Sequence, residues 1–124
     1  MKLARWLVIA GCVLSLATAV LHGTGYRAVS AEMSRSNAPA VLVAAFKCIW
    51  LLFSVQFIVL GAIAAAAVGS SRAKQLILLC SLIPLFDAGV MLYLLGPFIG
   101  AWCVGAVALL LLAGGILLPG PPGS

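Results

Sequence analysis

Asp87 lies inside the apolar stretch Ser81–Val90. A carboxylate at bilayer depth costs a few kcal/mol or more unless it is paired, protonated or hydrated, so residues of this kind commonly have a function. Pro84 lies three residues earlier and removes one backbone donor from the helix. Interrupted helices beside a carboxylate form ion and proton sites in transporters. Asp87, with a helix break at Pro84, is therefore the first candidate for a proton or ion site.

Three other polar side chains are candidates for the same site: His22, Lys47 and Gln56. Lys47 and Gln56 are nine residues apart, which is about 900° or half a turn out of phase, so only one of them can face Asp87. Counting from the outer helix ends puts Lys47 level with Asp87, whereas counting from the inner turn puts Gln56 there. We expect Lys47 to be the partner because its flexible stem can reach along the helix, and outward snorkelling of Lys47 is the alternative.

His22 ends the first apolar stretch and is followed by Gly23-Thr24-Gly25. A histidine in the last turn of a helix, with glycine after it, is a common C-terminal cap, which gives His22 a structural role. The functional alternative places His22 over the Lys47–Asp87 pair as a proton relay or headgroup ligand, because imidazole titrates near neutral pH.

The sequence has no cluster that indicates a metal site or an enzyme. Cys12, Cys48, Cys80 and Cys103 fall one to each apolar segment, without a C-x-x-C pair. His22 is the only histidine, which excludes a haem held by two imidazoles. We expect no catalytic residue, no metal and no cofactor, and we interpret the cysteines as small packing residues, with an interhelical pair as the alternative.

These residues lie in a chain with the composition of an integral membrane protein. Apolar residues make up 65% of the 124 and charged residues 7%, against about half and a quarter in soluble domains. A bilayer core needs about 20 apolar residues per helix, and four segments qualify: 3–22, 39–68, 75–95 and 98–118. The runs are continuously apolar, which favours helices over barrel strands. We predict an all-α integral membrane protein, a single four-transmembrane-helix antiparallel bundle, with residues 119–124 as a flexible tail.

The first segment also resembles an export signal, with a basic start at Met1–Arg5 and a possible cleavage site at Ala17-Thr18-Ala19. Ile9-Ala10-Gly11-Cys12 resembles a lipoprotein box, although about six apolar residues precede Cys12. We interpret the segment as a retained first transmembrane helix.

Basic residues are concentrated at one predicted end of the bundle. That end has Lys2, Arg5, Arg72 and Lys74, whereas the first connection has Arg27, Glu32 and Arg35. The positive-inside rule then predicts cytoplasmic N- and C-termini, in an inner or plasma membrane. No basic stripe with interleaved aromatic residues is present, so we expect no nucleic-acid partner.

Small residues recur every four positions at Gly61, Ala65 and Gly69, and again at Gly96 and Gly100. This spacing lets helix backbones approach, so we expect packing interfaces there, within the bundle or between copies. The connection over residues 23–38 is polar, and we expect a loop with a short interfacial helix at 30–35.

Three functions are compatible with this sequence. We favour an accessory or interaction subunit of a larger membrane complex, because the chain has little room for a water-soluble domain; its partners would be the lipid bilayer and other membrane subunits, or further copies of itself. The second is a proton- or ion-coupled small transporter that works as a dimer with Asp87 as the proton carrier. The third is a small membrane enzyme, or a binder of a lipid or quinone.

Overall fold

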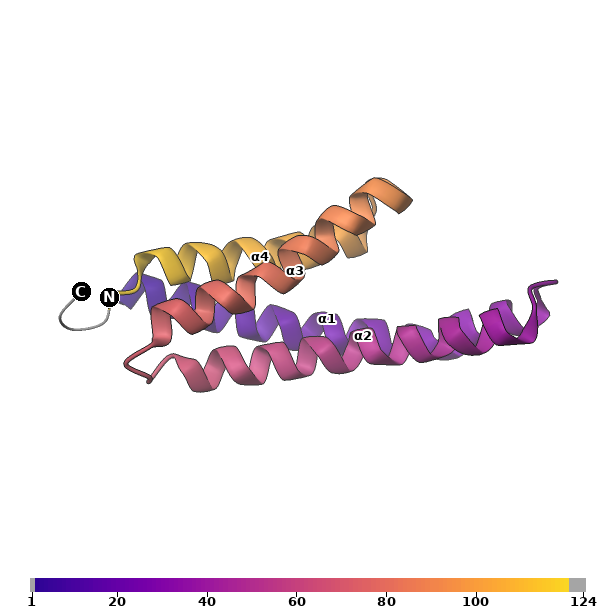
Figure 1. The fold of residues 1–124 in the computed structure, drawn as a ribbon, viewed down its shortest axis with the longest axis horizontal. Coiled ribbons are helices and arrows are strands. Elements are labelled where there is room, and N and C mark those ends of the chain that lie inside the picture. The colour runs from indigo at the N-terminus through magenta and orange to yellow at the C-terminus, as the bar shows by residue number, and fades with distance from the viewer. Residues whose placement is uncertain (1, 121–124) are drawn as a thin grey trace.

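The computed structural model describes residues 2–120, which form four α-helices and no β-strand. The helices are α1 (Lys2–Arg35), α2 (Ala40–Ala67), α3 (Ala73–Leu95) and α4 (Ile99–Leu117). Each is long and apolar enough to cross a membrane. The chain reverses direction at each connection, so the start of α1 and the end of α4 lie at the same end of the bundle (Figure 1). The predicted four-helix, all-α architecture is confirmed.

Pro119 and Gly120 follow α4 without helical structure. The remainder of the predicted tail, residues 121–124, lies outside the described residues.

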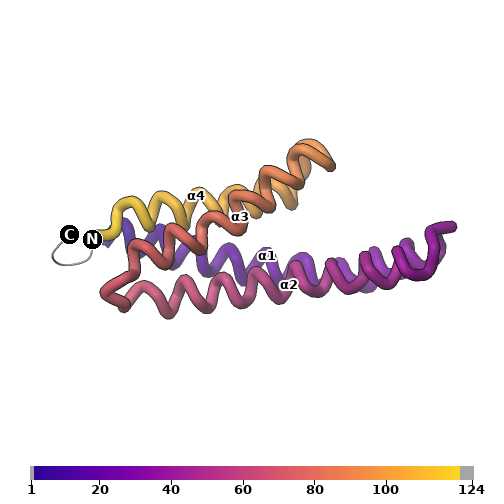
Figure 2. The backbone as a smooth tube through the Cα atoms, viewed as in Figure 1, coloured from indigo at the N-terminus to yellow at the C-terminus, as the bar shows by residue number. Residues whose placement is uncertain are grey.

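Helix α1 differs most from the prediction. It does not end at His22 but continues to Arg35, so residues 23–35 of the expected polar loop are the last part of a helix. At 1.5 Å per residue, the 34 residues of α1 span about 51 Å, and the 19 residues of α4 span about 28 Å. Consequently α1 and α2 extend well past the turn between α3 and α4 (Figure 2). We call this part, residues 27–45, the α1–α2 extension.

Contacts with α2 explain why α1 stays helical beyond its glycines. The Trp50 indole N–H donates to the His22 carbonyl at 2.8 Å, and the Lys47 ammonium donates to the Ser34 hydroxyl at 2.8 Å. Gly25 faces the Trp50 ring, and a Cβ there would lie 3.4 Å from Trp50 Cζ2, which is an ordinary van der Waals distance. The glycines that resemble a cap therefore lie within α1, on the side that faces α2.

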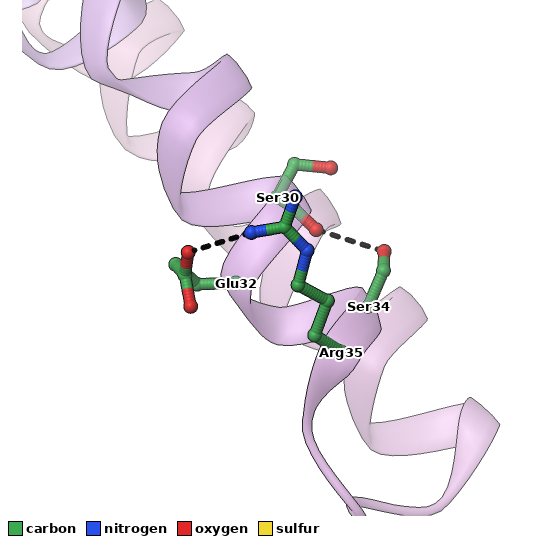
Figure 3. A network of polar contacts seen from close by, with 4 residues as sticks. All are labelled: Ser30, Glu32, Ser34 and Arg35. Atoms are coloured by element: carbon green, nitrogen blue, oxygen red, sulfur yellow. Dashed lines mark hydrogen bonds and ion pairs between the residues drawn. The ribbon is translucent and has the colours of Figure 1, made fainter.

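The end of α1 is polar (Figure 3). Arg35 Nη1 lies 3.2 Å from Glu32 Oε1, and the Ser34 hydroxyl donates to the Ser30 carbonyl at 2.8 Å. Glu32 and Arg35 are both exposed, so their ion pair contributes only about 0.3–0.5 kcal/mol. The short helix predicted over 30–35 is thus the last part of α1.

The four helices pack as two hairpins, α1–α2 and α3–α4. Extensive contacts also join α1 to α4, whereas α2 and α3 touch at few positions. The fully buried side chains include Val8, Phe57, Ile77, Val104, Val107 and Leu111. The seam between α2 and α3 is therefore the loosest contact between neighbouring helices in the bundle.

Of the three small residues of α2 singled out by their spacing, Gly61 alone packs within the bundle. Gly61 is buried, and a Cβ on it would lie 3.4 Å from the Cys12 carbonyl oxygen. Ala65 is exposed, and Gly69 has open space around its Cα. Helix phase is the reason, because α2 turns Ala64 rather than Ala65 towards the core.

Gly96 and Gly100 are both associated with the α3–α4 turn. Gly96 adopts φ 76° and ends α3, and its N–H donates to the Leu92 carbonyl. Gly100 leaves room for the Phe98 ring, which would come within 2.5 Å of a Cβ at that position. The predicted Gly96–Gly100 packing face is thus a turn in which the second glycine accommodates a nearby aromatic ring.

Candidate functional site

Asp87 is hydrogen-bonded to Gln56 rather than to Lys47. Gln56 Nε2 donates to Asp87 Oδ2 at 2.6 Å, which links α2 to α3, and both side chains are half-buried. The prediction that favoured Lys47 is wrong. The two helices share the short turn after Ala67, and this turn sets their relative level, so the count from the inner end was the correct one.

Lys47 belongs to the opposite, outer part of α2. Its Nζ donates to Ser34 Oγ of α1 at 2.8 Å, and its side chain is half-buried. Helix α2 reaches beyond the outer end of α3 (Figure 1), and the bond to Ser34 directs the Lys47 ammonium to α1, whereas Asp87 bonds to Gln56. Lys47 therefore joins α2 to Ser34 in the α1 part of the extension.

Helix α3 runs without interruption through Pro84, which is buried. The predicted break is not seen in this helix. Prolines are tolerated in transmembrane helices because neighbouring groups and small adjustments satisfy the freed carbonyl. The interrupted helix that would support an ion site beside Asp87 is therefore not a feature of α3.

His22 lies within α1 and packs against aromatic residues of α2. Its ring stacks on Trp50, with centroids 4.0 Å apart and planes 13° apart, and its centroid lies 5.0 Å from that of Phe53. Within residues 2–120, its enclosed Nε2 has no hydrogen-bond partner. His22 is neither a helix cap nor part of a Lys47–Asp87 pair.

An apolar cavity of about 440 Å³ lies beside His22, and all four helices contribute to its wall. The lining includes His22, Phe46, Trp50, Phe53, Met91 and Val104. The α1–α2 and α3–α4 hairpins diverge towards the α3–α4 turn (Figure 1), and Leu95 and Phe98 beside this turn line the cavity. We did not predict it from the sequence; the available signal was the i, i+4, i+7 spacing of Phe46, Trp50 and Phe53 on one face of a helix.

A groove of about 380 Å³ lies between α2 and α3 on the other side of the Gln56–Asp87 pair. Its lining includes Gln56, Val59, Ile63, Cys80 and Ile83. Along α3, Ile83 belongs to the groove and Met91 to the cavity, with Asp87 between them. The polar pair therefore separates the groove from the cavity.

The cysteines are free thiols, with Cys12 and Cys80 buried, Cys103 partly buried and Cys48 exposed. In the part of the chain that the structure describes, no three His, Cys, Asp or Glu side chains are placed to hold a metal ion. Comparisons with protein-family models, curated proteins and solved structures found no match to this chain.

Proposed function

We propose that this protein is an interaction subunit of a larger membrane assembly, and that a transmembrane helix of a partner subunit lies in the groove between α2 and α3. The observation that supports this is the Gln56–Asp87 pair at the edge of the groove. A carboxylate can accept several hydrogen bonds, and the Gln56 amide fills one of these positions. Gln56 also retains its own carbonyl acceptor. Unfilled acceptors are costly at bilayer depth, so the pair favours a partner helix that carries a donor such as Lys, Arg, Ser or Asn.

The α1–α2 extension supplies a second surface for such a partner. Val41 and Leu42 are 72% and 57% exposed, in a part of α2 that lies beyond the α3–α4 turn (Figure 2). The adjacent end of α1 carries Arg27, Glu32 and Arg35. Exposed apolar area beside a polar rim is typical of a protein interface.

The proposal includes an orientation in an inner or plasma membrane. Lys2, Arg5, Arg72 and Lys74 belong to the end of the bundle at which α1 begins and α2 turns into α3. Four basic residues there, against Arg27, Arg35 and Lys47 towards the other end, favour the cytoplasm for this end. The α1–α2 extension would then project to the opposite side.

The test is gentle release of the protein from its own membrane, followed by native mass spectrometry, for the wild type and for Asp87→Leu and Gln56→Leu. We expect other polypeptides in a fixed ratio with the wild type and at least a tenfold loss of them in both variants. Tyr93→Leu is the matched control, because Tyr93 is an exposed residue of the same helix. Helical circular dichroism verifies that each variant is folded.

Two outcomes would contradict this function. One is a chain that is released alone or only as a homodimer. The other is a partner that is retained equally by Asp87→Leu and Gln56→Leu. Loss of pH-dependent solute flux in a folded Asp87→Asn variant, with unchanged assembly, would instead support the transporter hypothesis.

A further inference from the structure

We propose that the cavity beside His22 is a binding site for the ring of a lipophilic quinone or quinol. This inference uses the cavity and the side chains around it, and it does not depend on the function proposed above. The cavity volume of about 440 Å³ lies within the range of about 300–1,000 Å³ typical of small-molecule sites.

The wall of the cavity suits a flat ring. The imidazole of His22 and the indole of Trp50 are nearly parallel, and Phe46 and Phe53 lie next to them, with tilted rings. Met91 completes the opposite wall from α3. Aromatic faces and a thioether pack well against another aromatic or quinonoid ring.

The polar groups of the cavity explain why the ligand should carry an oxygen. The Thr18 hydroxyl already donates to the Leu14 carbonyl, and the Trp50 indole N–H donates to the His22 carbonyl. The imidazole of His22 differs, because its Nε2 has no partner within residues 2–120. According to the tautomer, a neutral Nε2 either donates to the carbonyl of a quinone or accepts from the hydroxyl of a quinol. A plain acyl chain would leave Nε2 without a partner.

Access to the cavity is from the side of the bundle. The helices α2 and α3 touch at few positions. The two hairpins diverge towards the α3–α4 turn (Figure 1), and the cavity is lined from both hairpins. A ligand dissolved in the bilayer can therefore enter along this seam. The Gln56–Asp87 pair lies between the cavity and the groove, so a ring in the cavity would not occupy the groove of the partner helix.

Fluorescence of Trp50 tests the proposal with the full chain in detergent. Trp6 and Trp102 are exposed, so Trp6→Phe with Trp102→Phe leaves Trp50 as the single reporter. Decylubiquinone should then quench this emission in a saturable way. Adding His22→Phe keeps a ring beside Trp50 but removes both nitrogens, and the affinity should fall about tenfold.

A pair of matched variants tests the site without altering His22. Ile49 lines the cavity and is 63% exposed, so Ile49→Phe fills the entrance without disturbing the core. Leu51→Phe makes a similar change on the same helix at an exposed position outside the cavity lining. Saturable quenching should be weakened by Ile49→Phe and unchanged by Leu51→Phe.

Non-saturable quenching would overturn the proposal. So would equal affinity in the Ile49→Phe and Leu51→Phe proteins. Complete displacement of the quinone by equimolar oleic acid, together with no effect of His22→Phe, would show that the cavity takes an acyl chain and would also overturn it.

Discussion

Buried hydroxyl groups of this protein are paired with backbone carbonyls. Thr18, Ser54 and Ser81 donate within their own helices, to Leu14, Trp50 and Leu78. Ser15 is different, because its hydroxyl donates at 2.8 Å to the Phe57 carbonyl of the neighbouring helix. In a medium without water, buried polar groups need partners within the protein. For Ser15 the partner is a carbonyl of the neighbouring helix.

The Ser15 bond gives a prediction at the residue scale. Ser15→Ala should lower the free energy of unfolding by about 0.6 kcal/mol, and by less than about 2, as typical for interhelical bonds in membranes. Ser81→Ala is the matched control, since Ser81 is equally buried but bonds within α3, and its effect should be smaller. Reversible unfolding in mixed micelles gives both values. An equal or larger loss in Ser81→Ala would show that the Ser15 bond does not stabilise the α1–α2 contact.

At the scale of the elements, α1 and α4 approach closely because of glycine. A Cβ on Gly114 would lie 2.6 Å from Val8 Cγ2 and 3.1 Å from the Ala4 carbonyl oxygen. The Val8 methyl group could rotate away, but the backbone oxygen could not. The sequence spacing singled out Gly61, Ala65 and Gly69 of α2, whereas a Cβ at Gly114 would lie closer to the neighbouring helix than one at Gly61, 2.6 Å against 3.4 Å.

Gly114→Ala should therefore destabilise the bundle by about 1–3 kcal/mol through overpacking. Gly89→Ala is the control, because Gly89 lies within α3 with open space around it, and alanine there should be neutral or stabilising by about 0.5–1 kcal/mol. Thermal unfolding in detergent compares the two. If both variants melt at the same temperature, close α1–α4 packing does not limit stability.

At the scale of the whole molecule, the two ends differ in charge and in length. The end with the α2–α3 turn is compact and basic, and the other end carries the α1–α2 extension (Figure 1). Ser71 lies in the α2–α3 turn, and Ser36 follows α1 at the tip of the extension. Both are exposed, so they report on the orientation of the bundle.

Labelling of single cysteines checks the orientation. In a background with the four native cysteines changed to alanine, Ser36→Cys should react with a membrane-impermeant maleimide in intact cells. Ser71→Cys should react only after the cells are permeabilised, because the positive-inside rule places the basic end in the cytoplasm. The reverse pattern would show that the difference in basic residues does not determine the orientation.

The sequence by itself determined the class of protein and the number of helices. Apolar length is a local property, so α2, α3 and α4 begin and end close to the bounds that their apolar runs predict. It also identified Asp87 and Gln56 as polar residues that one helix could present to another, since helix phase follows from residue spacing alone.

Only the tertiary structure decided the partner of Asp87, the full length of α1 and the cavity beside His22. Each depends on how far one helix is shifted along another, which is set by contacts between residues distant in sequence. Lys47 and Gln56 were both acceptable until the α2–α3 turn set the level of Asp87. Helix α1 continues past Gly23 because α2 packs along it, and the cavity exists because the α1–α2 hairpin diverges from the α3–α4 hairpin at that level.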